Sequence, residues 1–381
     1  MNSVKTLYVF YHGRKVGTLA VHDHFLAAFQ YDREWLSEGF SISPFSLPLQ
    51  DKVFLPKPYP NEGLFGVFSD SLPDGWGRLL VDRLLLRNHI DPYETGSLNR
   101  LSIVGSTGMG ALTYQPEDRL FGEEERLEYD EIAAACRKIL NEEETDDLDE
   151  LFRLGGSSGG ARPKILTRIE GEPWIVKFPS ASDSADIGRQ EYDYSLCAKE
   201  CGIEMTETRL FPSRQCEGYF GTKRFDCTGQ GEETDRIHMI SAAGLLETSH
   251  RIPNLDYDQL MKMTLILTRD FSELKKLYRL MCFNVFAHNR DDHSKNFSYL
   301  YIEEEERWTL SPAYDLTYSA SLGGEHATMV HGNGRNPGRA DLLAVADQIG
   351  LSRRWAAETA DEIRECVRER LGRYLESSKG G

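Results

Sequence analysis

The most informative part of this chain is the polar loop at residues 288–296, which reads HNRDDHSKN. It contains Asp291 and Asn296 in the D-x-x-x-x-N spacing of a kinase catalytic loop. In such a loop the carboxylate accepts or orients the proton of the attacking hydroxyl, and the amide oxygen binds a magnesium ion at the transferring phosphate. His288 lies one residue further from the aspartate than in H-R-D, so the match is partial there. The spacing predicts Asp291 as a catalytic base and Asn296 as a metal ligand.

A second acidic residue follows in the segment LSPAYDLT at residues 310–317. Asp315 comes after a strand-like run, where the aspartate of D-F-G binds metal in a kinase. Mg²⁺ prefers oxygen ligands and keeps several waters, so a carboxylate, an amide and substrate phosphates suit it. A polar turn after an apolar helix has the same composition as the loop, and this alternative stays open. His288 and His293 also offer two zinc ligands, but no third soft ligand is nearby, and we favour a supporting role for His288.

A glycine-rich segment, LGGSSGGARPK, lies upstream at residues 154–164 and precedes a strand-like run. Glycines let backbone N–H groups approach an anion closely, so the segment predicts a phosphate-binding loop that ends at Lys164. It matches neither a Walker A loop nor G-x-G-x-x-G. A flexible connector of the same composition is the alternative.

Lys177 lies within the apolar run WIVKFP at residues 174–179. A buried ammonium group is costly without an anionic partner, and the phosphates of ATP would be such a partner. Glu191, in a predicted helix at residues 188–201, is a candidate to pair with Lys177 as the lysine–glutamate pair does in protein kinases. The alternative is a lysine on an edge strand that reaches solvent.

The length of 381 residues exceeds the size at which one hydrophobic core stops growing, so we expect more than one domain. Alternating apolar and polar residues at 5–20, around a turn at 12–14, predict a β-hairpin. Further along the chain, we expect a helix at 78–86, a strand at 101–112 and helical character without a strong core pattern at 117–150. Strands are expected at 164–168 and 173–178. Beyond 257 we expect mostly helices, with a β-rich stretch at 297–310. The expected domains are an N-terminal subdomain at 1–115, an acidic helical connector at 116–150, a nucleotide-binding part at 151–250 and a helical catalytic lobe at 251–381.

Composition excludes several classes of protein. The chain is 40% hydrophobic and 28% charged, as in an ordinary globular protein. Its net charge of −17 argues against a broad DNA-binding face, because nucleic-acid affinity depends on Lys and Arg at phosphates. Seven cysteines without a CxxC pair give neither a disulfide framework nor a zinc-site spacing. With no apolar run of membrane-spanning length and no secretion signal, we expect a cytoplasmic protein.

Taken together, these motifs resemble those of the HipA family of toxin kinases along nearly the whole chain. Four segments carry the resemblance: residues 65–77 with LPDG, the Ser/Gly loop that ends at Lys164, KRFD at 223–226, and the D-x-H-x-K-N loop at 291–296 followed by Tyr314-Asp315. The resemblance implies an α+β, protein-kinase-like, two-lobed core with an N-terminal β-rich subdomain and a helical C-terminal lobe. It also implies transfer of phosphate from ATP, with Mg²⁺, to a serine or threonine of a protein.

The resemblance further implies roles for individual residues. Lys177 corresponds to the phosphate lysine, residues 223–225 to a hinge that meets adenine through its backbone, and His293 and Tyr314 to the lining of the nucleotide pocket. The hinge begins with Lys223 where the best-known family member has an acid, which bears on nucleotide selectivity. The residues expected to bind the nucleotide are Gly159, Gly160, Ala161, Arg162, Pro163, Lys164, Lys177, Lys223, Arg224, Phe225, His293, Ser294, Lys295 and Tyr314.

Regulation and partners are also implied by the resemblance. Ser157 aligns with a serine whose autophosphorylation expels the loop in the family, and Ser158 is a second candidate. A phosphate there would repel ATP, because it adds about −1.5 to −2 charges at pH 7. The implied partners are a HipB-like helix-turn-helix antitoxin, operator DNA only through that antitoxin, and a protein substrate such as an aminoacyl-tRNA synthetase. A kinase-fold corepressor without significant catalysis and a small-molecule kinase remain as alternatives.

Overall fold

A computed structural model describes residues 3–23, 25–118, 127–156, 158–181, 183–229 and 234–376. Ser157, one of the two expected phosphorylation sites, lies outside the described residues. The chain forms two compact units. The first comprises Met1–Gly188, Phe211–Ile240 and Gly244–Thr248, and the second comprises Arg189–Leu210, Ser241–Ala243 and Ser249–Gly381.

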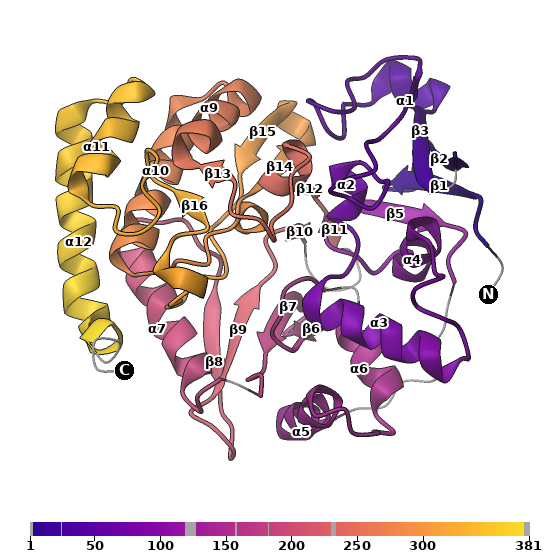
Figure 1. Ribbon diagram of the computed structural model, residues 1–381, viewed down its shortest axis with the longest axis horizontal. Coiled ribbons are helices and arrows are strands. Elements are labelled where there is room, and N and C mark those ends of the chain that lie inside the picture. Colours follow the sequence, from indigo (N-terminus) through magenta and orange to yellow (C-terminus); the bar gives the residue numbers. More distant parts are fainter. Residues whose placement is uncertain are drawn as a thin grey trace. The chain divides into compact units, whose positions relative to one another are not determined.

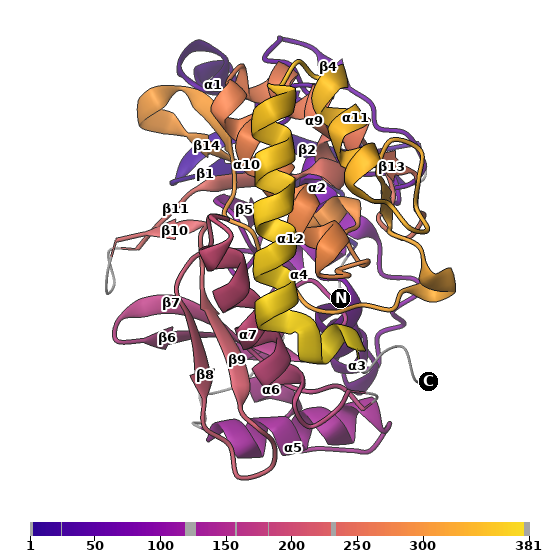
Figure 2. The same ribbon diagram turned by 90° about the vertical axis from the view of Figure 1, so that its left-hand side faces the viewer.

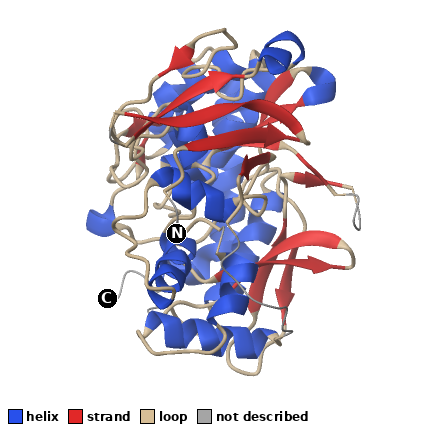
Figure 3. Ribbon diagram, turned by 90° about the vertical axis from the view of Figure 1, so that its right-hand side faces the viewer, coloured by secondary structure: helices blue, strands red, loops and turns tan. Residues whose placement is uncertain are grey.

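The first unit contains an antiparallel five-stranded sheet in the order β4-β3-β2-β1-β5, drawn among the red strands of Figure 3. Its strands are β1 (Thr6–Tyr11), β2 (Arg14–His22), β3 (Leu26–Tyr31), β4 (Val53–Phe54) and β5 (Leu112–Gln115). Leu7, Val9 and Tyr11 of β1 are buried and alternate with more exposed residues, the period expected of a strand with one face on the core. The predicted hairpin is therefore confirmed.

The strand predicted at residues 101–112 is wrong over most of its length, because helix α4 (Ser97–Val104) occupies its first part, turns follow, and β5 begins only at Leu112. Leu98, Leu101 and Val104 are buried together with all the residues between them. A segment that is buried on every side has no amphipathic period, so periodicity does not distinguish a helix from a strand there. Gly105, with φ of +51°, follows the helix as its C-cap.

The helices of the first unit are α1 (Arg33–Glu38), α2 (Gly66–Ser69), α3 (Gly75–Arg87), α4, α5 (Tyr129–Leu140) and α6 (Leu148–Gly155) (Figure 1). Trp76, Leu80 and Leu84 form a buried stripe of α3, and this stripe packs in one core with Cys136 of α5 and Phe152 of α6. The helix predicted near residues 78–86 is confirmed. The expectation of a weak core pattern at 117–150 is wrong for α5, which buries one face between its charged residues.

A second group of antiparallel strands in the first unit comprises β6 (Lys164–Ile169), β7 (Glu172–Lys177) and β9 (Tyr219–Lys223), and a short pair comprises β10 (Cys227–Thr228) and β11 (Asp235–Arg236). Both strands predicted at residues 164–178 are confirmed. The chain passes between the two units within β8 (Thr208–Phe211), β12 (His238–Ser241) and α8 (Ala242–Leu245).

The second unit is mainly helical, as expected beyond residue 257. Its helices are α7 (Ile187–Glu200, which begins in the first unit), α9 (Tyr257–Thr268), α10 (Phe271–Phe286), α11 (Arg339–Gln348) and α12 (Arg353–Glu376), with 3₁₀ turns η1 (Ser294–Asn296), η2 (Glu303–Glu305) and η3 (Leu322–Gly324). The strands β14 (Ser298–Ile302) and β15 (Arg307–Leu310) pair antiparallel, and β13 (Leu255–Asp256) and β16 (Thr328–Met329) pair in parallel. The long helix α12 packs on α10 and α11 (Figure 2). Among the described residues, none of the helices is long and apolar enough to cross a membrane.

Candidate active site

The loop at residues 288–296 connects α10 to β14 in the second unit. Helix α10 ends at Phe286, and the N–H of Asn289 then donates to the carbonyl oxygen of Asn284 at 3.0 Å, which turns the chain out of the helix. His288 has a φ of +51°, a left-handed conformation that is unfavourable for a side chain of this size. Its carbonyl oxygen accepts a hydrogen bond from the N–H of Ser319 at 3.0 Å. This contact is made by the backbone, so the supporting role of the His288 side chain stays a prediction.

Asp291 is exposed, and Asn296 is bonded to its backbone. The side-chain amide nitrogen of Asn296 donates to the carbonyl oxygen of Asp291 at 2.7 Å. Because the nitrogen is used in this way, the amide oxygen is left for another contact. An oxygen is the atom that a magnesium ion takes from an asparagine, so the geometry fits the expected metal ligand.

Asp292, the neighbour of Asp291, is fully buried and anchors the loop. Its carboxylate accepts hydrogen bonds from the hydroxyl of Tyr257 at 3.0 Å, from Nδ1 of His326 at 3.1 Å and from the N–H of Thr328 at 3.2 Å. Tyr257 also accepts a hydrogen bond from the side chain of Asn284 on α10. A buried carboxylate is stable only when it is hydrogen-bonded or paired with a cation, so this network explains why the fold tolerates an aspartate here. Sequence reasoning gave Asp292 no role.

Asp315 follows β15 and has a φ of +55°. Non-glycine residues held in this region are uncommon and gather at functional sites, where the surrounding structure imposes the conformation. The preceding residue ties the segment to the loop, because the hydroxyl of Tyr314 donates to the carbonyl oxygen of Lys295 at 2.6 Å. The same hydroxyl lies 2.6 Å from Oγ of Ser298. Asp315 is thus held next to the segment that contains Asn296.

His293 is half-buried, and its ring lies 5.4 Å from the ring of His250. Among the residues that the structure describes, neither His288 nor His293 belongs to a cluster of three or more metal-binding side chains. The zinc alternative for this loop therefore gains no support. Two buried oxygen atoms of the loop, Oδ1 of Asn289 and Oγ of Ser294, lack a hydrogen-bond partner within the described part of the chain. Such atoms are rare in proteins, and a bound ligand would satisfy them.

In the first unit, the glycine-rich loop at 155–164 is braced by the start of α3. The N–H of Trp76 donates to the carbonyl oxygen of Gly160 at 2.9 Å, and the carboxylate of Asp74 accepts a hydrogen bond from the N–H of Gly160. A Cβ atom on Gly77 would lie 2.2 Å from the carbonyl oxygen of Ser158, so only glycine allows this close approach. The LPDGWG segment, which includes the LPDG that contributes to the resemblance, is therefore the support of the glycine-rich loop.

Within that loop, the side chain of Lys164 donates to the carbonyl oxygen of Gly159 at 2.5 Å. Ser158 is 2% exposed, and its hydroxyl donates to the carbonyl oxygen of Gly155 at 2.5 Å. Arg162 forms a two-point ion pair with Asp183 at 3.1 and 3.3 Å. Of the expected nucleotide ligands Gly159, Gly160, Ala161, Arg162, Pro163 and Lys164, the structure thus brings the two glycines and Lys164 together at the tip of the loop.

Lys177 lies directly opposite Lys164 in the antiparallel pair β6–β7. Both side chains are buried, with 9% and 7% exposed, and the ammonium group of Lys177 lies 5.6 Å from the ring centre of Phe220. Two cationic side chains on the same face of a sheet would both attract the phosphates of a nucleotide.

The expected hinge at residues 223–225 begins at the last residue of β9. The side chain of Lys223 pairs with Glu172 at 2.6 Å, so it does not need an anion from outside the protein. The N–H of Arg224 donates to the carbonyl oxygen of Pro173, and its guanidinium binds Asp226 at 2.9 and 2.7 Å. Burial alone would raise the pKa of Asp226, but the Arg224 guanidinium lowers it to about 2. Arg224 therefore has a structural role, and adenine contacts would use the backbone of its neighbours.

The chain is similar to known proteins over most of its length. The HipA N-terminal domain model matches residues 7–115, and the HipA-like C-terminal domain model matches residues 156–371. A curated protein of Sinorhizobium fredii, described as putative kinase Y4mE, is 24% identical over 350 residues, which cover 82% of this chain and 77% of that protein. A chain in the Shewanella oneidensis MR-1 toxin–antitoxin complex of HipA, HipB and operator DNA has a TM-score of 0.71 and 18% identity, and the match covers 96% of this chain and 90% of that one. The predicted α+β, HipA-type fold is confirmed, and the chain belongs to the HipA family.

Proposed function

We propose that this protein is a HipA-type toxin kinase that transfers the γ-phosphate of ATP to a serine or threonine of a protein, in the cytoplasm. Membership of the HipA family and the likeness to a putative kinase support phosphotransfer as the reaction class. The single observation that carries the proposal is the buried, directly opposed pair Lys164 and Lys177. Two buried ammonium groups on facing positions are a site for a polyanion, and the phosphates of a nucleotide fit it.

The second unit supplies the groups that phosphotransfer needs after the nucleotide is bound. Asp291 is exposed, so its carboxylate can accept the proton of a substrate hydroxyl. Asn296 and Asp315 would hold Mg²⁺, since both offer oxygen atoms and Asn296 uses only its nitrogen within the loop. A bound magnesium ion neutralises charge that develops on the phosphate oxygens. The buried carboxylate of Asp292 holds the loop in place through its hydrogen bonds to Tyr257 and Thr328, and it would not contact a reactant itself.

The remaining expected nucleotide ligands of the second unit are His293, Ser294, Lys295 and Tyr314. The buried Oγ of Ser294, which has no hydrogen-bond partner in the described part of the chain, supports a polar ligand next to this turn. Tyr314 contributes its hydroxyl to Lys295 and Ser298, so any contact with a nucleotide would come from its ring.

Autophosphorylation in the glycine-rich loop is the regulatory part of the proposal, at Ser157 or Ser158. Ser158 is buried and bonded to Gly155, so its hydroxyl reaches no phosphate donor while the loop holds the conformation described above. Phosphorylation of Ser158 therefore requires the loop to leave its brace at Trp76 and Asp74 first. A phosphate added there would keep the loop out, since a group of about −2 charge is poorly accommodated in a buried site.

We further propose a HipB-like helix-turn-helix antitoxin as the partner, because the Shewanella relative is found in a complex with HipB and operator DNA. Binding of DNA by this chain would be indirect, since its net charge of −17 opposes contact with phosphates. The proposed substrate is a protein of the translation machinery such as an aminoacyl-tRNA synthetase.

The direct test measures transfer of labelled phosphate from ATP with Mg²⁺ to the purified protein and to candidate synthetases. We expect labelling by the wild type and a loss of about 100- to 10,000-fold in Asp291→Ala, which is the usual contribution of a general base. Asp361→Ala is the matched control, because this acid lies in an exposed pair with Arg339 on α11 and α12. Equal labelling by the wild type and Asp291→Ala would refute the proposal. A wild type that transfers no phosphate, but still strengthens antitoxin binding to its operator, would instead identify a corepressor.

A further inference from the structure

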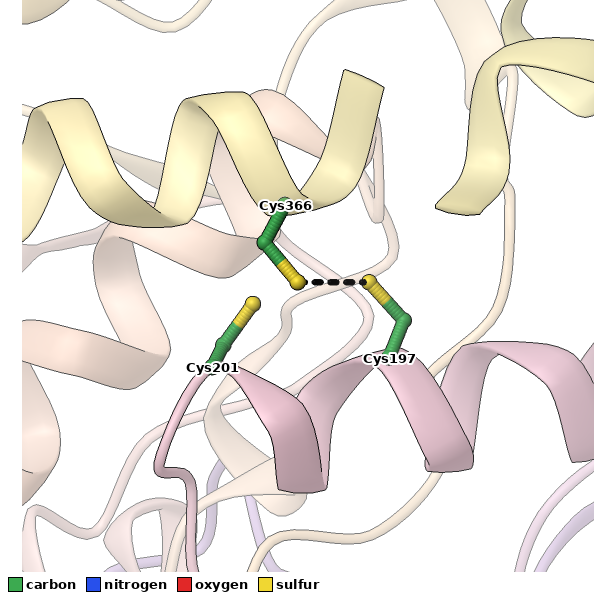
Figure 4. Close-up of side chains that lie close together, drawn as sticks. All are labelled: Cys197, Cys201 and Cys366. Carbon is green, nitrogen blue, oxygen red and sulfur yellow. Dashed lines mark hydrogen bonds between the residues drawn. The ribbon is translucent and has the colours of Figure 1, made fainter. Parts of the chain in front are cut away.

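Three cysteines gather between two helices of the second unit. Cys197 lies on α7, Cys201 follows one turn later at the end of the same helix, and Cys366 lies on α12 (Figure 4). Their sulfur atoms all lie within 4.8 Å of one another, and those of Cys197 and Cys366 are 4.0 Å apart. Cys197 and Cys201 are buried, whereas Cys366 is half-buried and leaves a path from solvent.

The spacing of the sulfur atoms is that of metal ligands rather than of a disulfide. Three thiolates around one ion, each about 2.3 Å from it, have sulfur atoms roughly 3.8–4.0 Å apart. A disulfide requires sulfur atoms about 2.05 Å apart. The 4.0 Å between Cys197 and Cys366 matches the first geometry and would have to shrink by half for the second. Cys201 supplies the third sulfur from the same face of α7, because residues four apart lie one above the other.

Charged side chains order the helix end that carries two of the cysteines. Arg370 on α12 pairs with Glu200, the last residue of α7, at 2.6 Å, which is a further link between the two helices that carry the cluster. The guanidinium of Arg279 donates to the carbonyl oxygen of Cys201 at 3.2 Å and orders the end of α7. The three sulfur atoms are therefore attached to segments that are held in place by other contacts.

We propose that Cys197, Cys201 and Cys366 bind one thiophilic divalent ion, with Zn²⁺ as the closest fit. The three thiols lose three protons and form three Zn–S bonds, and the fourth position is open to water or a small-molecule thiol. The resulting site carries one negative charge. The ion joins the end of α7 to α12, so its binding stabilises the packing of these helices. Thiols that serve only as small apolar side chains would show no such dependence on metal.

The test uses the full-length protein, whose cysteines are reduced with a reagent that is not itself a thiol and from which metal has been removed. Because the test requires no ATP, its outcome is independent of the proposed kinase activity. Zinc is titrated against a chromophoric chelator, and Co²⁺ is added separately to record the thiolate-to-cobalt absorption band. We expect one equivalent of tightly bound Zn²⁺, a cobalt band typical of thiolate ligands, and a higher unfolding temperature with zinc.

Cys366→Ser and Cys201→Ser should each weaken zinc binding by more than the roughly 10- to 100-fold that loss of an outer-shell partner causes. Cys216→Ser is the matched control, because Cys216 is a half-buried free cysteine of the first unit and lies outside the cluster. Circular dichroism verifies that each variant is folded. The proposal would be overturned if the protein bound no zinc tightly, or if Cys366→Ser bound zinc as well as the wild type. It would also be overturned if mild oxidation formed an intramolecular disulfide equally well with zinc present.

Discussion

The backbone N–H of Trp76 donates to the carbonyl oxygen of Gly160 at 2.9 Å, which joins the start of α3 to the tip of the glycine-rich loop. The carboxylate of Asp74 accepts from the N–H of the same glycine, so both polar groups of Gly160 are held by one turn of chain. A loop that is flexible by composition is therefore positioned by a segment far away in sequence. This bracing explains why the LPDGWG segment accompanies the phosphate-binding loop in the same unit.

Gly77→Ala should loosen this brace. The added methyl group would lie 2.2 Å from the carbonyl oxygen of Ser158 and 2.8 Å from Cβ of Pro73, so either α3 or the loop must move. We expect a loss of about 1–3 kcal/mol of unfolding free energy and faster proteolytic cleavage in the loop. Gly96→Ala is the control, because nothing lies within 4 Å of the added atom. Equal cleavage of both variants would contradict the brace.

Lys177→Met should weaken nucleotide binding. Loss of an ammonium group that binds phosphate weakens affinity for an ATP analogue about 10- to 100-fold, because a hydrogen bond to a charged group contributes about 1.5–3 kcal/mol. Calorimetric titration measures the affinity, and denaturant unfolding verifies that the variant is folded. Arg168→Met, at an exposed position of β6, should leave affinity unchanged.

Asp292→Asn should impair the active-site loop without removing a group that touches substrate. An amide has only one oxygen. With that oxygen towards Tyr257 and His326, the NH₂ group would face the N–H donor of Thr328. We expect a loss of about 1–3 kcal/mol in stability, the usual cost of leaving buried polar groups unpaired. Phosphate transfer should fall through kcat, with KM for ATP little changed. A variant with wild-type stability and wild-type kcat would show that the network does not position Asp291.

His238 should make the protein less stable in mild acid. It is fully buried, burial lowers its pKa from 6.5 to about 4, and Nε2 donates to the carbonyl oxygen of Ile42 at 2.8 Å. Between these two pKa values the unfolded chain takes up a proton that the folded protein does not. The stability is therefore complete above about pH 6.5 and is lost as the pH falls towards 4.

His238→Gln, which keeps an N–H donor, should lack this dependence. From pH 7 to pH 5 the wild type should lose about 2 kcal/mol more unfolding free energy than the variant. Urea unfolding at the two pH values measures the difference. Parallel losses in both proteins would assign the acid sensitivity to other groups.

Local patterns predicted the elements whose signals are contained within a few residues. The hairpin at the N-terminus, the strands β6 and β7 and the helix α7 all follow from alternation or helical periodicity over short windows. Helix α4 was missed because its residues are buried on every side, which erases the period that identifies a helix. The core face of α5 was also missed, since its apolar residues lie between many charged ones.

The residues of the candidate site also divide into those that the sequence indicated and those that it did not. Asp291 and Asn296 were found because their chemistry requires a fixed separation along the chain, and the hydrogen bond between them spans that same separation. The role of Asp292 was invisible, because its partners Tyr257, His326 and Thr328 lie more than thirty residues away in either direction. The functional assignments of both groups remain predictions that the experiments above address.

Amino-acid order was sufficient to recognise the family and to propose a reaction class, because catalytic loops and glycine-rich loops are contiguous segments whose residue types are read directly. It was insufficient for the contacts that join distant segments. Asp74 and Gly160 are 86 residues apart, and Cys197 and Cys366 are 169 residues apart. Hydrogen bonds and metal ligation act over only a few ångströms, so such partners become recognisable only after packing of the apolar faces of α3, α7 and α12 has brought their segments together.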